Sequence, residues 1–226
     1  GIPANQLSDP GGILFHGGSL YVGNRHGNIL GQGSVKQFPW NGTAISPGTT
    51  IATASNAAYQ GFHGFGFAPN GDLWVSTVSG GSRRYRNPGS GFVDIGGSAA
   101  GNVRDTWVSP DGLKLFETGI GNQIFVSDVT SSGVGSRTAF TVNGSSAMHQ
   151  LAYSGGSLYT CGFYSNTIHK IVLDGNYNPV SSSVVANSNQ PIGIAITADG
   201  NTMFVSSHTG NTITRFSLVG STGTNQ

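Results

Sequence analysis

The sequence has little charge, one cysteine and no long apolar run, and each shortage excludes a class of protein. Charged residues make up 8% of the 226 residues and the formal net charge is +1, so no basic field favours nucleic acid. Cys161 is the only cysteine, which excludes an internal disulfide. No apolar run approaches the roughly 18 residues of a spanning helix. We therefore expect neither a nucleic-acid partner nor a membrane span.

Glycine and small polar residues are abundant instead. The chain has 37 glycines, and 36% of its residues are hydrophobic, which is enough for a core built from short segments. A surface rich in Gly, Ser, Thr and Asn and poor in charge is typical of secreted, periplasmic, cell-surface and virion-surface proteins. We therefore expect an extracytoplasmic protein.

One pattern repeats along the whole sequence. Each copy has a short apolar run, a GG, NG or DG turn and a second apolar run, and such dipeptides accept the positive φ of tight hairpin turns. The copies start at Gly12, Gly64, Asp105, Gln150 and Gly193, with spacings of 52, 41, 45 and 43 residues. A period of roughly 40–50 residues with several strands per copy is typical of a β-propeller.

The five copies predict an all-β fold, a five-bladed β-propeller with four antiparallel strands per blade and a single domain over residues 1–226. The expected blades span residues 11–60, 61–101, 102–147, 148–190 and 191–226, the last together with 1–10. The final copy stops after its third strand, so we expect Gly1–Ser8 to complete the last blade and close the ring without a free edge. An open β-solenoid is the alternative fold.

The last copy also resembles a known repeat. The stretch PIGIAITADGNTMFVSSHTGNTITRFSL, from Pro191 to Leu218, is similar to YVTN-type and NHL-type propeller repeats in its Pro-x-Gly-Ile-Ala start, its Asp-Gly turn and the Asn-Thr before its third strand. GSLYTCGFYSNTIHKIVLDGN in the fourth copy matches fairly, and the first three copies match loosely. Those families include lactonases, lyases, surface-layer proteins, binding modules and adhesins, so the resemblance implies the fold and leaves the function open.

Candidate site residues follow from the register of the repeat. In a propeller, the segment that enters each inner strand shares one face with the loop between the second and third strands. The position before each inner strand is occupied by Gly11, His63, Arg104, His149 and Ile192. The candidate ligand-binding residues on this face are Arg104, His63, His149, Asp105, His26, His208 and Tyr164.

The first interpretation of this face is an anion pocket. Arg104, between two histidines in the ring, would hold a carboxylate, sulfate or phosphate through charge-assisted hydrogen bonds, with Asp105 orienting its guanidinium. His63 or His149 could then act as a base near neutral pH. These two histidines are the catalytic candidates if the protein is a lactonase or lyase.

The second interpretation is a metal site. His63 and His149 resemble in location the histidine ligands of the propeller amidating lyase. Arg104 between them opposes a divalent cation, so we expect no cofactor and keep a divalent metal on these histidines as the alternative. In a third interpretation, the imidazoles only donate to nearby carbonyls and fill the channel.

Two weaker candidates lie outside this set. Glu117 stands where sibling copies have Val or Thr, and a buried carboxylate there would need a partner such as Arg104 or a neighbour. The run Arg83–Arg86 would contact an acidic glycan or phosphate, or form a solvated strand.

The sequence thus favours a propeller that binds a carbohydrate, an anionic small molecule or a surface protein at the mouth of its channel. A lactonase-like or lyase-like enzyme using the same face is the first alternative. A structural component of a cell surface or virion is the second.

Overall fold

The computed structural model describes residues 2, 6–26, 32–54, 61–89, 91–99 and 101–219. These residues form twenty β-strands and no α-helix. Accordingly, the described part of the chain offers no helix with the length and apolar character needed to cross a membrane.

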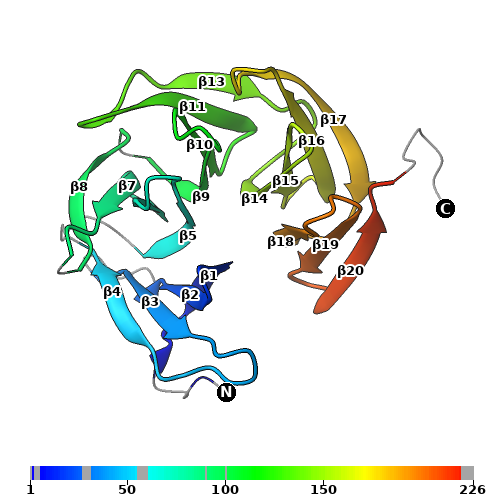
Figure 1. The fold of residues 1–226 in the computed structure, drawn as a ribbon. Coiled ribbons are helices and arrows are strands. Elements are labelled where there is room, and N and C mark those ends of the chain that lie inside the picture. The colour runs from blue at the N-terminus through cyan, green and yellow to red at the C-terminus, as the bar shows by residue number, and fades with distance from the viewer. Residues whose placement is uncertain are drawn as a thin grey trace. The chain divides into compact units, whose positions relative to one another are not determined.

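Five antiparallel sheets follow one another along the chain (Figure 1). The first sheet contains β1 (Pro10–His16), β2 (Ser19–Asn24), β3 (Ser34–Pro39) and β4 (Thr49–Thr53). The second contains β5 (Phe62–Phe67), β6 (Leu73–Thr77), β7 (Gly81–Arg86) and β8 (Val93–Gly97). The third contains β9 (Val103–Val108), β10 (Lys114–Gly119), β11 (Gln123–Thr130), β12 (Gly133–Val134) and β13 (Thr138–Thr141), with β12 and β13 both paired to β11.

The fourth sheet contains β14 (Met148–Ser154), β15 (Ser157–Gly162), β16 (Thr167–Leu173) and β17 (Pro179–Asn187). The fifth contains β18 (Pro191–Ile196), β19 (Thr202–Ser207) and β20 (Thr212–Ser217). Each sheet corresponds to one copy of the sequence repeat. The predicted all-β, five-bladed β-propeller is therefore confirmed, and each sheet is one blade.

The predicted closing strand falls largely on residues 1 and 3–5, which lie outside the described residues. The described part of that segment contacts the first blade. The amide of Gly48 donates to Oε1 of Gln6 at 2.9 Å, and the amide of Ser8 donates to Oδ1 of Asn24 at 2.9 Å. Closure of the last blade by Gly1–Ser8 stays a prediction.

The chain divides into two compact units, which are described separately below. The first comprises residues 1–117 and 127–137, and the second comprises 118–126 and 138–226. In the first unit, Phe62, Leu73 and Tyr85 pack in one buried cluster. In the second, Ile168, Ile194 and Val205 do the same. Each cluster contains residues from two successive sheets, and the second strands β6 and β15 are buried along their whole length.

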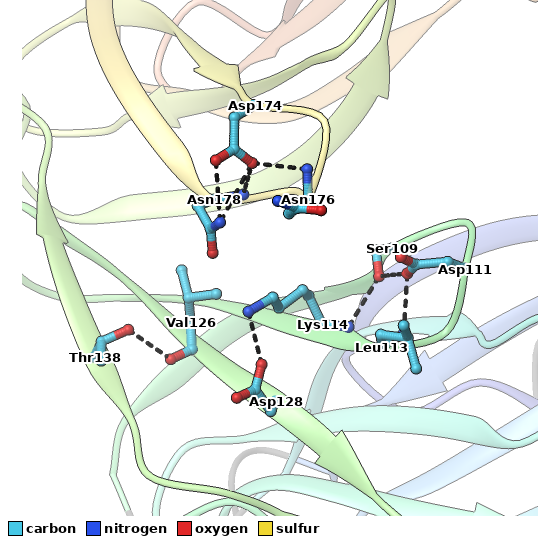
Figure 2. A network of polar contacts seen from close by, with 10 residues as sticks. All are labelled: Ser109, Asp111, Leu113, Lys114, Val126, Asp128, Thr138, Asp174, Asn176 and Asn178. Carbon is cyan, nitrogen blue, oxygen red and sulfur yellow. Dashed lines mark hydrogen bonds and ion pairs between the residues drawn. The ribbon is translucent and has the colours of Figure 1, made fainter.

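Short side chains stabilise the turns that join the strands (Figure 2). In the first unit, Asp111 accepts hydrogen bonds from the Ser109 hydroxyl and the Leu113 amide. In the second, Asp174 accepts the amides of Asn176 and Asn178 at 2.9 and 2.8 Å. Such local bonds satisfy backbone groups that no strand pairs with.

Candidate functional site

Each inner strand of four blades begins with the same distortion. A residue with positive φ precedes the strand in each case: Asp9, Gly61, Ala147 and Gln190. The register between the inner and second strands then shifts within a few residues. The residues inside these shifts include Gly11, His63, His149 and Ile192. A β-bulge re-aims side chains and is common beside functional sites, so these predicted ring positions lie where the strand leaves its regular pleat.

The loop after the second strand is attached to the same positive-φ residues. The amide of Arg25 donates to the carbonyl of Asp9, and the amide of Phe163 donates to that of Ala147, both at 3.0 Å. The amide of His208 donates to the carbonyl of Gln190 at 3.0 Å. Arg25, Phe163 and His208 therefore hold equivalent positions in their blades. In each of these blades the loop lies beside the strand entry.

In the second unit, three rings surround Phe163. The ring centroid of Phe163 lies 5.3 Å from that of His149, 5.0 Å from that of Tyr164 and 5.7 Å from that of His208. Tyr164 is 70% exposed and His208 is exposed, whereas His149 and Phe163 are half-buried. We call these four residues the aromatic cluster. It brings together three of the residues selected from the sequence: His149, Tyr164 and His208.

Hydrogen bonds fix the backbone beneath the aromatic cluster. The hydroxyl of Thr118 donates to the carbonyl of His149 at 2.7 Å. The amide of Gln190 donates to Oδ1 of Asn166 at 2.9 Å, and the carbonyl of Gln190 accepts the amide of His208. The loops of the fourth and fifth blades are thus linked through Asn166 and Gln190. This gives the exposed rings a preorganised base, as a binding site requires.

In the first unit, His63 and Asp105 are buried, with 6% and 4% of their surface exposed, and Arg104 is half-buried. The hydroxyl of Ser76 donates to the carbonyl of Gly64 at 2.9 Å and to that of Arg104 at 3.2 Å. A Cβ at Gly64 would collide with the carboxylate of Asp105, so this carboxylate rests on the backbone of β5. The roles predicted for Arg104, His63 and Asp105 stay predictions.

His26 is tied into the first blade. Its ring Nε2 lies 3.0 Å from Oγ of Ser34, and its amide donates to the carbonyl of Ser8 at 3.2 Å. The neighbouring Arg25 forms an ion pair with Asp9. These contacts hold the loop against the N-terminal segment, and a ligand role for His26 stays a prediction.

Glu117 has the neighbouring partner that its burial requires. The carboxylate lies 3.1 Å from Nε of Arg137, and it accepts the hydroxyl of Ser98 at 2.5 Å and the amide of Ser82 at 3.1 Å. The fully buried carboxylate is thus contacted by three groups of the first unit. Removing it would leave buried charge and donors uncompensated.

The run Arg83–Arg86 forms internal ion pairs in the second blade. Arg83 pairs with Asp94, whereas Arg84 and Arg86 both pair with Asp72. Burial, the largest single effect, raises the pKa of Asp72, but hydrogen bonds from Arg86 and Arg84 together outweigh it and lower that pKa below its ordinary value. The solvated-strand interpretation applies only to Arg86, whose side chain is 46% exposed. Arg84 is buried beneath its partners.

Within the described residues, no group of three or more His, Cys, Asp or Glu side chains is arranged to hold a metal ion. His63 and His149 belong to different compact units. The alternative of a divalent metal on these two histidines therefore stays a prediction.

The sequence analysis missed Phe163, which lies at the centre of the aromatic cluster. A signal for it was present in the aligned copies, because GFYSNT in the fourth copy and SHTGNT in the fifth both end at the Asn-Thr pair. Counting back from that pair places Phe163 opposite His208. Of these two residues only His208 has a polar side chain, and the candidates were selected mainly for polar groups.

No family model matches the chain, and no curated protein matches it in sequence. Solved structures nevertheless resemble it in fold. A chain of the nidogen/laminin complex aligns with a TM-score of 0.72 at 12% identity, over 92% of this chain and 76% of that one. A Bacteroides uniformis protein assigned as a 6-phosphogluconolactonase aligns with a TM-score of 0.64 at 16% identity, over 91% of this chain.

A Thermus thermophilus protein assigned as a glucose dehydrogenase aligns with a TM-score of 0.63 at 14% identity, over 89% of this chain and 79% of that one. The chain spans 65% of the length of the Bacteroides protein. Likenesses at these identities show the fold alone, and the YVTN or NHL repeat type stays a prediction. The chain is therefore a five-bladed β-propeller that shares its fold with lactonase-like and sugar dehydrogenase-like propellers.

Proposed function

We propose that the chain is an extracytoplasmic ligand-binding propeller and that the aromatic cluster binds carbohydrate. The observation that carries this proposal is the convergence of four rings at the loops of the fourth and fifth blades, with Tyr164 and His208 exposed. Single exposed aromatic rings are common on protein surfaces, but a group of them in one place marks an interaction site.

The chemistry of the cluster suits a sugar better than a charged ligand. The apolar C–H face of a pyranose packs on an aromatic ring, while its hydroxyls need donors and acceptors at the edge of the contact. Tyr164 offers a ring with a hydroxyl, and the exposed imidazole of His208 offers polar ring nitrogens. A neutral oligosaccharide would use all of these groups and require no ion pair.

Two further observations support the proposal, one for the sugar ligand and one for the location. Two of the solved structures that share the fold are named for sugar derivatives, a 6-phosphogluconolactonase and a glucose dehydrogenase. The charge-poor composition, at 8% charged residues, is compatible with a protein that works outside the cytoplasm.

Arg104 has its own place in the proposal. Arg104, which is half-buried and precedes Asp105 in the sequence, would bind the carboxylate or phosphate of an acidic sugar. Changing Arg104 to Ala should therefore weaken binding of acidic probes and leave neutral probes unaffected. Equal loss for both kinds of probe would contradict this assignment.

The proposal is tested by calorimetric titration with a panel of neutral probes, cellohexaose, maltohexaose and chitohexaose, and one acidic probe, trigalacturonate. Tyr164→Ala should weaken binding about fivefold, since stacking on one aromatic ring contributes about 1 kcal/mol. Trp40→Ala is the matched control, because Trp40 is an exposed aromatic of the first unit. Loss of binding in Trp40→Ala alone, or no binding to any probe, would overturn the proposal.

A further inference from the structure

A series of hydrogen-bonded side chains runs beneath the loop that presents Phe163 and Tyr164, and it ends at a buried histidine. The hydroxyl of Ser165 donates to the carbonyl of Gly162 at 3.2 Å. Oγ of Ser165 lies 2.7 Å from Oγ1 of Thr167, and Oγ1 of Thr167 lies 2.8 Å from Nε2 of His169. His169 is fully buried on β16. None of the proposed ligand contacts uses it.

The direction of these hydrogen bonds is an assignment, because either hydroxyl can donate between Ser165 and Thr167. With the single hydroxyl hydrogen of Ser165 assigned to the carbonyl of Gly162, Thr167 donates to Ser165. His169 then donates from Nε2 to Thr167, as the Nε2–H form of the imidazole.

The surroundings of the second ring nitrogen agree with this tautomer. Within the described residues, Nδ1 of His169 is buried without a hydrogen-bond partner. Burial lowers the pKa of His169, so the ring is neutral near pH 7 and only one nitrogen carries a hydrogen. A buried acceptor without a partner is tolerated better than a buried N–H without one.

These hydrogen-bonded side chains reach the loop that carries Phe163 and Tyr164 of the aromatic cluster. Ser165 directly follows Tyr164, and the amides of Phe163 and Tyr164 donate to the carbonyls of Ala147 and Ser146 at 3.0 and 3.2 Å. A Cβ at Gly162 would collide with the hydroxyl of Ser165, so glycine lets the hydroxyls close over the backbone. The loop is thus held by the amides of Phe163 and Tyr164 and by the hydrogen bonds that link Ser165, Thr167 and His169.

We propose that His169 is a positioning residue that, as the neutral Nε2–H tautomer, holds the Phe163–Asn166 loop through Thr167 and Ser165. It thereby fixes two rings of the aromatic cluster. The effect on ligand binding rests on the proposed function, whereas the effect on the loop does not.

The decisive experiment is native-state hydrogen exchange on a matched pair of variants, Thr167→Val and Thr167→Ser. Thr167→Val keeps the shape of the side chain and removes the hydroxyl that links Ser165 to His169. Exchange of the Phe163 and Tyr164 amides should rise about tenfold. Thr167→Ser restores the hydroxyl and should exchange as the original protein does. The amide of His208, which bonds to Gln190, is the internal control and should not change.

A second measurement distinguishes a local effect on the loop from general unfolding of the variant. The ring nitrogen and carbon shifts of His169 in NMR spectra should report the neutral Nε2–H tautomer at pH 7. His169→Gln, whose amide N–H can replace the Nε2–H donor, should keep slow exchange at Phe163, and His169→Leu should lose it. The Nδ1–H tautomer, a charged ring, or loop exchange unaffected by Thr167→Val would overturn the inference.

Titration with cellohexaose separates this inference from the proposed function. If the original protein binds the probe, Thr167→Val should weaken binding about fivefold and Thr167→Ser should not. Equal affinity of Thr167→Val and the original protein would contradict the link to the ligand. If the original protein binds no probe in the panel, the proposed function fails, and the exchange data alone decide whether His169 positions the loop.

Discussion

Two loops of the second unit have the same backbone turn, but different side chains hold it in place. The loop of the fourth blade, Phe163–Asn166, and that of the fifth, His208–Asn211, begin with an amide bonded to a positive-φ residue. Both also place an asparagine in the positive-φ region, Asn166 at 58° and Asn211 at 48°. The turn is therefore a property of the repeat.

The side chains beneath the two loops are different. The fifth blade uses one serine, because Ser207 accepts the amide of Gly210 at 3.0 Å and donates to the carbonyl of Asn189 at 2.6 Å. The fourth blade has Gly162 at the matching position and uses Ser165, Thr167 and His169 instead. The position of His169 is taken by the exposed Thr214 in the fifth blade.

The two blades therefore hold the same turn in different ways. A single serine holds the fifth loop, whereas the fourth loop has Gly162 at that position and is held by side chains that end at a buried imidazole. Burying a polar ring carries a cost unless hydrogen bonds compensate it. His169 is therefore the residue of the fourth blade to test first.

The largest expected effect separates His169 from its counterpart. His169→Leu should destabilise the protein by about 2 kcal/mol, because the half-buried Thr167 loses its partner on a fully buried ring. Thr214→Leu at the matching exposed position should change stability by less than about 0.5 kcal/mol. Urea unfolding measures both. Equal effects at the two sites would remove the distinction between the blades.

The next effect concerns pH. Because the pKa of folded His169 is lowered by burial, the unfolded chain binds the proton more readily. The sign is therefore a loss of stability as pH falls below about 6.5, the pKa of an unperturbed histidine, by at most about 1.4 kcal/mol per pH unit. Urea unfolding between pH 7 and pH 5 should show this slope. His169→Gln should reduce it, and an unchanged slope would assign it to other groups.

The smallest effect tests the fifth loop. Ser207→Ala should destabilise the protein by about 1 kcal/mol, because the amide of Gly210 and the carbonyl of Asn189 each lose a partner. Exchange of the Gly210 amide should accelerate while exchange at Phe163 stays unchanged. Faster exchange at both loops would show that they open together and would contradict the claim that separate side chains hold them.

The fold was predictable from the sequence because it depends on a local and repeated pattern. Paired apolar runs with a Gly-containing turn recur five times, and each copy became one sheet. The register of the repeat also located the strand entries at Gly11, His63, His149 and Ile192, which the structure places at β-bulges. Periodicity carries this information without any knowledge of contacts.

The partners of the polar residues were not predictable in the same way. The arginines of the run Arg83–Arg86 looked exposed, yet Asp72, in the turn before β6, and Asp94, on β8, form ion pairs with them. Glu117 is paired with Arg137, twenty residues further along the chain. His169 attracted no attention because its role depends on two hydroxyls across a turn. Such contacts depend on which side chains face each other across strands, which a single sequence does not show.

The most direct test of the account is an NMR titration of the aromatic ring signals of the original protein with cellohexaose, maltohexaose and chitohexaose. The account predicts that at least one probe shifts the signals of His149, Phe163, Tyr164 and His208 together and leaves those of Trp40 in place. Shifts confined to Trp40, or no shift with any of the three probes, would contradict a carbohydrate site at the aromatic cluster.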